Sequence, residues 1–380
     1  MSSADRPLRV AQFGVGYTGE SSVRYLLDHP GIELVGVRCY RPERAGVDVG
    51  KLVGRDPVGI TTTTDVDGLL ALRPDCAVFM PRDPHDDPSL PDAQSAGWLA
   101  ELEVLLRAGV NVVSPIITTC HWRHLSRGIE FRDRVEQWCR EGGSTVHFTG
   151  FDPGFATDAL AFTMSACVGE VSTVSIWEII DVAGYTSAPA LERLGFGQDP
   201  AAFAGASPDT FRLGWGGALH LLGDALGVVV EDLGFEFESW SSPRSFVTPG
   251  GFSIAEGTIA AIRWQLSAIV DGEPRFTLQK ITRAGADAAP DWPSLGTDGG
   301  YRVVIDADPP FRGDFPMGLP GGRGSTFADA MAMTAARCVN AVPAVVAARS
   351  GYVTFLDLPP LGGVPLRASA RVSSGEGAGA

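Results

Sequence analysis

Short apolar runs alternate with amphipathic segments over the first 150 residues of the chain. The apolar runs, which predict strands, lie at residues 8–13, 32–37, 76–80, 110–114 and 144–149. Helical spacing of apolar residues predicts helices at 20–27, 98–108 and 129–140. Repeated strand and helix units of this kind form a parallel sheet whose ligand lies beyond the carboxyl ends of the strands. We therefore expect a Rossmann-like, doubly wound α/β domain over residues 1–150.

The pattern changes after residue 150. Residues 171–181 alternate apolar and polar side chains before becoming apolar, and a short turn joins the β-rich segments 258–270 and 275–283. Residues 301–307 add a strand, and 213–226 reads as a helix. Strands joined by short turns indicate a mainly antiparallel sheet. A second, α+β domain is therefore expected over residues 151–324. A last helix is expected from 327 to about 339, before Pro343.

A glycine-spaced turn follows the first predicted strand directly. Its residues are Gly14, Val15, Gly16, Tyr17, Thr18 and Gly19. In a GxGxxG turn between a strand and a helix, the first glycine permits the tight turn, the second lets the backbone approach a pyrophosphate, and the third lets helix and strand pack closely. This context favours a dinucleotide site over an ordinary glycine-rich turn.

The end of the second strand is basic. Arg38 and Arg41 stand where NAD-preferring folds usually carry an acidic residue, and arginine there suits a 2′-phosphate. NADP is therefore the expected cofactor, with NAD as a possibility and a solvated basic loop as the alternative interpretation. Pro81 and Pro115, which directly follow two of the predicted strands, are further candidates for cofactor contact.

Charge and composition limit the kinds of molecule that the protein is expected to bind. The net charge of −15 argues against nucleic acid, and the sequence has no run of about 18 apolar residues that would suggest a membrane span. The N-terminus lacks the apolar segment of a signal peptide, and the six cysteines are scattered without zinc-site spacing. A reduced, cytoplasmic setting without a bound metal is expected. Only two lysines, Lys51 and Lys280, are available for proton transfer or Schiff-base chemistry.

Several segments together resemble one family. They are Gly14–Gly19, Gly46–Gly50, Gly109–Ser114, the turn Gly150–Phe155 with Asp158, and Ala335–Pro343 running on to Asp357–Pro359. These segments span nearly the whole chain. The sequence resembles the 2,4-diaminopentanoate dehydrogenase and native amine dehydrogenase group, whose N-terminal domain is like that of dihydrodipicolinate reductase.

The resemblance implies a domain organisation and a reaction. The nucleotide domain would be completed by the C-terminal segment 325–365, followed by a flexible tail at 366–380. The inserted domain, 151–324, would bind substrate and form a homodimer. The reaction would transfer a hydride between a nicotinamide and a small carbonyl or imine. The paired-histidine and lysine motif of true dihydrodipicolinate reductases is absent, and Ser114-Pro115-Ile116 replaces the Glu-Lys-Pro of related sugar dehydrogenases.

Three residues are candidates for catalysis. Amine-forming relatives carry a glutamate in the loop after the Asn-Val-Val strand, whereas residues 116–122 contain no carboxylate here. His121 in this loop titrates near neutrality and is the first candidate for proton transfer, with a packed or surface histidine as the alternative. Asp152 and Asp158 flank a proline-glycine turn at the domain junction. Each is a candidate for substrate contact, although Asp152 can stabilise the turn and Asp158 can cap the next helix.

Other polar and aromatic residues have two interpretations each. Of Glu178 and Asp181, one could anchor an ammonium group while the other faces solvent. The aromatic residues Trp177, Tyr185, Phe196 and Trp215 could line an apolar pocket or belong to the core. Glu101 is expected on the solvated face of its helix.

Two classes of function follow. The chain is expected to be an oxidoreductase that acts on a small carbonyl or amine. The alternatives are a cofactor-binding sensor or scaffold, or a carbonyl or alcohol dehydrogenase on the same fold.

Overall fold

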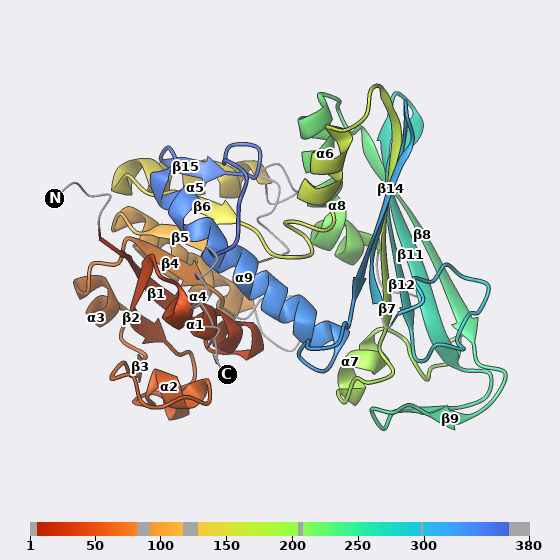
Figure 1. Ribbon diagram of the computed structural model, residues 1–380, viewed down its shortest axis with the longest axis horizontal. Helices are drawn as coiled ribbons and strands as arrows, with labels where there is room; N and C mark the ends of the chain where they lie inside the picture. The colour runs from red at the N-terminus through yellow and green to blue at the C-terminus, as the bar shows by residue number, and fades with distance from the viewer. Residues whose placement is uncertain (1–5, 82–91, 117–127, 204–207, 298, 365–380) are drawn as a thin grey trace, which may run out of the picture.

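The computed structural model describes residues 6–81, 92–116, 128–203, 208–297 and 299–364. Two units lie side by side and are joined by the long helix α9 (Thr326–Ala347), which runs from one unit to the other (Figure 1). The first unit is built around a parallel sheet, and the second around a broad mixed sheet.

The first unit contains a seven-stranded sheet in the order β15-β6-β5-β4-β1-β2-β3, and all pairings between these strands are parallel. The strands are β1 (Leu8–Phe13), β2 (Ile32–Arg38), β3 (Thr62–Thr63), β4 (Cys76–Phe79), β5 (Asn111–Ser114), β6 (Thr145–Phe148) and β15 (Gly351–Val353). Strands β4 and β6 are buried throughout because helices cover both faces, which explains their continuous apolar sequence.

Helices form two layers around this sheet. Helix α1 (Tyr17–Asp28) and the C-terminal part of α9 cover one face, where Val10, Val78 and Val113 point. Helices α3 (Val66–Ala71), α4 (Asp92–Arg107) and α5 (Gly128–Gly142) cover the other, where Phe79 and Val112 point. A short 3₁₀ helix, η1 (Pro42–Arg44), and α2 (Val49–Leu52) lie between β2 and β3.

The second unit contains a six-stranded sheet in the order β14-β13-β7-β12-β11-β8. Its strands are β7 (Val171–Asp181), β8 (Asp232–Ser241), β11 (Ile259–Val270), β12 (Glu273–Arg283), β13 (Gly299–Ala307) and β14 (Phe311–Met317). All neighbours are antiparallel except β7 and β12, which run parallel. The predicted Rossmann-like domain and mainly antiparallel second sheet are thus both present.

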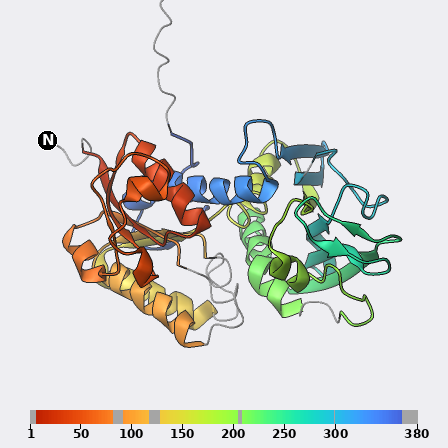
Figure 2. The ribbon, with the colours of Figure 1, turned by 90° about the horizontal axis from the view of Figure 1, so that it is seen from below.

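Helices α6 (Ala159–Ser165) and α8 (Pro208–Leu226) pack on one face of this second sheet, between it and the first unit (Figures 1 and 2). The remaining elements of the unit are α7 (Ala188–Arg193) and the short pair β9 (Phe246–Val247) and β10 (Ser253–Ile254). Among the described elements, no helix covers the opposite face of the sheet (Figure 2).

Helix α9 differs from its prediction, because it continues through Pro343 to Ala347 instead of ending near Val339. A proline inside a helix costs about 3 kcal/mol. Val342 and Val345, which lie on either side of Pro343, are fully buried in the core of the first unit, and this packing maintains the helix. Within the described chain, α9 is the one helix long and apolar enough to cross a membrane. Its apolar face packs against α1 and β5.

Candidate active site

The glycine turn after β1 has the shape of a dinucleotide cradle. The φ angle of Gly14 is +94°, and a Cβ atom there would lie 2.1 Å from the carbonyl oxygen of Met80. A Cβ atom on Gly19 would lie 2.2 Å from the carbonyl oxygen of Gly14. Beside Gly16, by contrast, a Cβ atom would meet nothing within 4 Å. The turn thus leaves open space at the start of α1, where backbone N–H groups attract a pyrophosphate.

The other residues of the turn lie around this open space. Val15 is buried, Thr18 donates a hydrogen bond to the sulfur of Met331, and Tyr17 is 58% exposed. Pro81 and Pro115 follow β4 and β5 at the same edge of the sheet. The predicted cofactor contacts are therefore brought to one edge, and the residues present fit a dinucleotide.

The arginines after β2 have different environments. Arg38 is held in an ion pair with Glu101, with 2.9 Å between Nε and Oε1, and Glu101 also accepts a hydrogen bond from the Tyr40 hydroxyl. The side chain of Glu101 is only 10% exposed, so the expectation that it lies on a solvated face is wrong. Arg41 is exposed at the start of η1. Arg44 donates to the carbonyl oxygen of Val15, which places it beside the glycine turn.

A row of side chains crosses the second sheet. Tyr301 on β13 is paired with Glu178 on β7, Glu178 with Lys280 on β12, and Lys280 with Trp264 on β11. Residues in register on adjacent strands point to the same face, so these four side chains lie together. The row is on the face that packs against α6 and α8, toward the first unit.

Asp152, in the turn by which the chain leaves the first unit, completes this row as a hydrogen-bonded cluster. Lys280 Nζ lies 2.6 Å from Asp152 Oδ2 and 2.5 Å from Glu178 Oε2. The Tyr301 hydroxyl oxygen lies 2.9 Å from Asp152 Oδ2 and 2.9 Å from Glu178 Oε1. Trp215 on α8 donates from Nε1 to Asp152 Oδ1 over 3.0 Å. These five residues are called the lysine cluster below.

The lysine cluster is nearly buried. The side chains of Lys280, Asp152 and Glu178 are 10%, 8% and 13% exposed. Burial raises the pKa of Glu178 and the carboxylate of Asp152 adds to the rise, while Lys280 opposes both. Burial acts to lower the pKa of Lys280, but the two carboxylates outweigh it and hold that pKa above its usual value. Burial also raises the pKa of Tyr301 well above its usual range.

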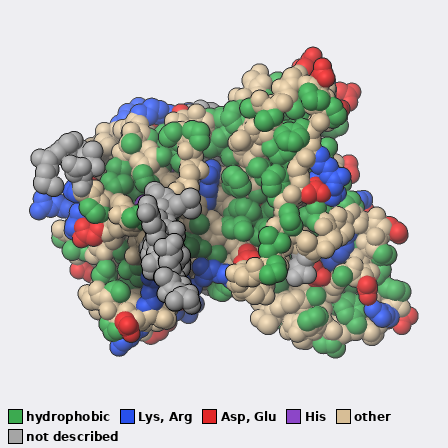
Figure 3. Space-filling view, in the orientation of Figure 1, with side chains coloured by type: hydrophobic (Ala, Val, Ile, Leu, Met, Phe, Trp, Pro, Cys, Tyr) green, Lys and Arg blue, Asp and Glu red, His purple; other side chains and the backbone are tan. Residues whose placement is uncertain are grey.

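Aromatic rings lie at the cluster and at the nucleotide turn. Lys280 Nζ lies 4.1 Å from the ring centroid of Trp215, a cation–π contact. Phe327 of α9 packs against Tyr17 of the glycine turn and against Tyr185, with ring centroids 5.8 and 5.2 Å apart. Figure 3 shows that the surface is hollowed between the two units, and hydrophobic side chains gather along its second-unit side.

The predicted catalytic residues are not all brought together. Asp152 belongs to the lysine cluster, whereas His121 lies outside the described residues. Asp158 is fully buried at the start of α6, where its carboxylate accepts hydrogen bonds from the N–H groups of Ala159 and Gly154. These bonds cap the helix and brace the turn, which is the alternative interpretation given for Asp158.

The structure also distinguishes between the two interpretations given for polar and aromatic residues of the second domain. Glu178 is the carboxylate that faces the cluster, and Asp181 instead accepts a hydrogen bond from the N–H of Ala183. Trp215 lies in the cluster, and Tyr185 lies between the cluster and α9. Phe196 is fully buried in a separate core, as in the alternative interpretation. Trp177 precedes Glu178 on β7 and therefore points to the opposite face of the sheet.

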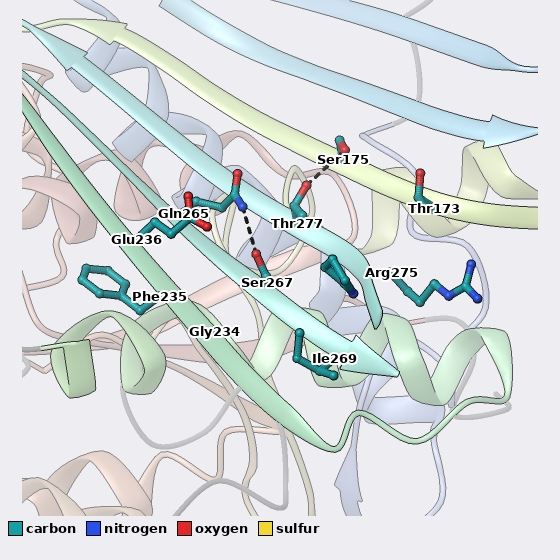
Figure 4. A pocket seen from close by; sticks show the side chains of 11 residues that line it. Thr173, Ser175, Gly234, Phe235, Glu236, Gln265, Ser267, Ile269, Arg275 and Thr277 are labelled. Atoms are coloured by element: carbon teal, nitrogen blue, oxygen red, sulfur yellow. Dashed lines mark hydrogen bonds between the residues drawn. The ribbon is translucent and has the colours of Figure 1, made fainter. Parts of the chain in front are cut away.

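A separate pocket of about 430 Å³ lies on the other face of the sheet (Figure 4). Ser175 and Thr277 line it, and their positions on β7 and β12 alternate with those of Glu178 and Lys280. Its lining combines hydroxyl and amide groups with charged and apolar side chains, and hydrogen bonds join Thr277 to Ser175 and Gln265 to Ser267. This pocket therefore faces away from the nucleotide turn and is not the candidate active site.

Comparison with known proteins assigns the family. Residues 155–369, more than half of the chain, match the family described as "2,4-diaminopentanoate dehydrogenase C-terminal domain". The chain belongs to the 2,4-diaminopentanoate dehydrogenase family. The resemblance noted in the sequence is thereby confirmed, and with it the class of nicotinamide-dependent dehydrogenase.

Two relatives and one solved structure are similar to this dehydrogenase over nearly its whole length. An amine dehydrogenase of Streptomyces virginiae is 30% identical over 355 residues, which span 91% of this chain and 95% of the relative. The 2,4-diaminopentanoate dehydrogenase of Acetoanaerobium sticklandii is 23% identical over 366 residues, 93% of each chain. The structure of an amine dehydrogenase from Mycobacterium smegmatis matches with a TM-score of 0.69 at 19% identity, covering 96% of this chain and 98% of that one. This structural match supports the fold of the dehydrogenase.

Lys280 and Tyr301 were not identified as site residues from the sequence. The sequence did contain a sign that Lys280 is buried. It follows Phe276 and Leu278 at every second position of β12, and these two residues face the core. Glu178 follows Val174 and Ile176 on β7 in the same way. A charged residue on the apolar side of a strand needs a partner. In this dehydrogenase the two positions partner each other.

Proposed function

We propose that this dehydrogenase interconverts a small amine with ammonia and the corresponding ketone or aldehyde, using NADP(H). The observation that carries the proposal is the lysine cluster, a nearly buried group of two carboxyls and one ammonium on the sheet face toward the nucleotide unit. Amine chemistry passes through ammonium and iminium species, which are cationic. Carboxylates beneath aromatic rings favour such a nitrogen over a neutral one.

The cofactor would be held by the first unit. The backbone of Gly14–Gly19 and the first N–H groups of α1 would bind the pyrophosphate, with Pro81 and Pro115 at the neighbouring strand ends. Arg41, which is exposed, is the arginine placed to receive a 2′-phosphate, whereas Arg44 is held beside the glycine turn by the Val15 carbonyl and by an ion pair with Glu20. When bound, the nicotinamide gives a hydride to the substrate carbon or takes one from it.

The lysine cluster would bind the nitrogen and move its proton. In the direction of amine formation, a carboxylate takes a proton from ammonium, and the ammonia that is released adds to the carbonyl carbon. A proton then moves within the adduct from its nitrogen to its oxygen and forms a hydroxyl group. The same carboxyl then returns the proton to the hydroxyl of the adduct, which leaves as water and forms the iminium. One proton is taken and one returned, so the cluster is regenerated before the hydride step.

Each remaining member of the cluster has a part in this scheme. Lys280 holds Asp152 and Glu178 together, and Tyr301 bridges the same two carboxyls. Trp215 orients Asp152 through its indole N–H and presents its ring to the ammonium of Lys280. The hydrophobic side chains along the hollow would exclude water from the substrate carbon.

We also propose that the protein is a homodimer that forms through the open face of the second sheet. Strands β7 and β12 form the centre of this face, and the described helices of the unit lie on the other side. A second copy would cover the pocket lined by Ser175 and Thr277.

The test is NADPH oxidation with a panel of small ketones and aldehydes, with and without ammonium. Oxidation is expected only when carbonyl and ammonium are both present. Tyr301→Phe removes one hydroxyl from the cluster and should reduce turnover by about 10²-fold while NADPH affinity stays within a few-fold. Equal oxidation with and without ammonium would instead indicate a carbonyl dehydrogenase, and NADPH binding without turnover would indicate a sensor or scaffold.

A further inference from the structure

We infer that the lysine cluster holds one shared proton at neutral pH and that Glu178 carries it, as a neutral carboxylic acid beside the ionised pair of Asp152 and Lys280. The inference deepens the proposed function, on which its catalytic consequence rests. The placement of the proton itself rests on the hydrogen-bond geometry of the cluster.

The hydroxyl group of Tyr301 has a single hydrogen atom, yet its oxygen lies 2.9 Å from an oxygen of each carboxyl group. It can donate to only one of them. If both carboxyls were ionised, the second contact would bring two oxygen lone pairs together without a hydrogen between them. A proton on one carboxyl removes this conflict, because that carboxyl then donates to the Tyr301 oxygen.

The number of donors decides which carboxyl holds the proton. Asp152 is approached by three donors, from Lys280, Tyr301 and Trp215. Glu178 is approached by Lys280 at Oε2, and its Oε1 faces only Tyr301 among the hydrogen bonds of the described residues. More donors stabilise an anion better, so Asp152 is the ionised member. With the proton on Glu178 Oε1, every polar atom of the two carboxyls has a matching partner.

The charges around Glu178 agree with this placement. Lys280 approaches from β12, Asp152 from the turn after β6, and the neutral hydroxyl of Tyr301 from β13. Burial raises the pKa of Tyr185 in the loop after β7, and the charge of Glu178 adds to this rise. Burial acts on Glu178 in the same direction and raises its pKa. The cluster is then neutral with the proton and carries one negative charge without it.

This state gives the cluster a definite role in amine chemistry. Glu178 gives its proton to the hydroxyl of the ammonia adduct, which leaves as water, and the carboxylate that remains takes a proton from the next ammonium, so the acid is restored. The line from Glu178 through the Tyr301 hydroxyl to Asp152 lets the proton move between the carboxyls without leaving the cluster. Glu178 therefore alternates between acid and base within one turnover.

A matched pair of substitutions tests where the proton is, independently of turnover. Glu178→Gln replaces a neutral acid by a neutral amide of the same shape, so thermal unfolding at pH 7 should shift by less than about 2 °C. Asp152→Asn removes the anion that faces a buried ammonium and should lower the melting temperature by roughly 5–15 °C. The reverse order would place the proton on Asp152, and equal losses from both changes would mean that both carboxyls are ionised. Either result overturns the inference.

Infrared spectroscopy of the full-length protein provides the second measurement. The wild type at pH 7 should show the carbonyl stretch of a buried protonated carboxyl, and this band should be absent from Glu178→Gln. Persistence of an unchanged band in Glu178→Gln would contradict the inference. Glu178→Gln should also lose about 10²-fold or more in ammonium-dependent turnover. If no amine is formed by any variant, the proposed function fails, whereas the band and the unfolding pattern still report on the proton.

Discussion

Lys280 Nζ lies 2.6 Å from Asp152 Oδ2, although the two residues are 128 positions apart in the chain. One belongs to the central part of the second sheet, and the other to the turn by which the chain leaves the nucleotide unit. The contact fastens the sheet to this turn and places the lysine cluster at the junction. The candidate active site therefore forms only when both units are folded against each other.

Removal of this ammonium should destabilise the protein in a pH-dependent way. Lys280→Met leaves two buried carboxyls without a cation, which costs about 3–5 kcal/mol at pH 8. Without the cation, the pKa of Glu178 in the folded state should rise further, because Lys280 no longer opposes the effect of burial. The loss should then be small at pH 5, should grow as the pH rises from the unfolded pKa of Glu178 toward its raised folded pKa, and should be constant above that value. Denaturant unfolding between pH 5 and 8 measures this, with Lys51→Met, at an exposed lysine, as the control. An equal loss at every pH would contradict the account.

Two substitutions in the glycine turn should have different effects, one on the stability of the fold and the other on the affinity for the cofactor. Gly14→Ala places a Cβ atom against the Met80 carbonyl in a left-handed backbone and should cost about 1–3 kcal/mol of stability. Gly16→Ala meets no protein atom within 4 Å and has a φ angle of −72°, so the fold should be unchanged. Its methyl group should instead occupy the cofactor's space and weaken NADPH binding at least tenfold. Calorimetric titration and thermal unfolding of the two variants test this, and unchanged NADPH affinity in Gly16→Ala would oppose the assignment.

Cofactor preference should depend more on Arg41 than on Arg38. Arg38 is committed to Glu101, while Arg41 is exposed and available to a phosphate. Arg41→Asp should reduce NADPH affinity by at least tenfold and leave NADH affinity nearly unchanged, because only NADPH carries the 2′-phosphate. In Arg38→Ala we expect a smaller change in the ratio of the two affinities. A ratio unaffected by Arg41→Asp would show that another group selects the cofactor.

The open sheet face should control assembly. The wild type is expected to have about twice the monomer mass of 40.0 kDa by light scattering at micromolar concentration. Gln265→Lys combined with Thr277→Lys introduces charges on the open face and should shift the mass to that of the monomer without unfolding the sheet. A wild-type mass near 40.0 kDa would contradict the dimer.

The sequence predicted elements better than it predicted contacts between them. The apolar runs and the glycine spacing identified the first sheet because both are local patterns. Glu178, Lys280 and Tyr301 meet because β7 pairs in parallel with β12 and antiparallel with β13 in one register. A shift by one residue would point all three to the opposite face. Strand pairing of this kind depends on the whole fold.

The same reason explains the error over Glu101. Glu101 lies on a helix with an ordinary amphipathic pattern, and its burial comes from Arg38 and Tyr40, which approach from the end of β2. For Asp158, the local sequence is consistent with helix capping and with substrate contact. The hydrogen bonds that its carboxylate accepts from the N–H groups of Ala159 and Gly154 show the capping role.

The most direct test of the proposed function follows the nitrogen itself. The protein is incubated with NADPH, a carbonyl substrate from the panel and ¹⁵N-labelled ammonium, and the products are identified by mass spectrometry. We predict one ¹⁵N-labelled amine for each NADPH oxidised in the wild type, and at least about 10²-fold slower labelling in Glu178→Gln. Formation of an unlabelled alcohol, or no product from a protein that binds NADPH, would contradict the account.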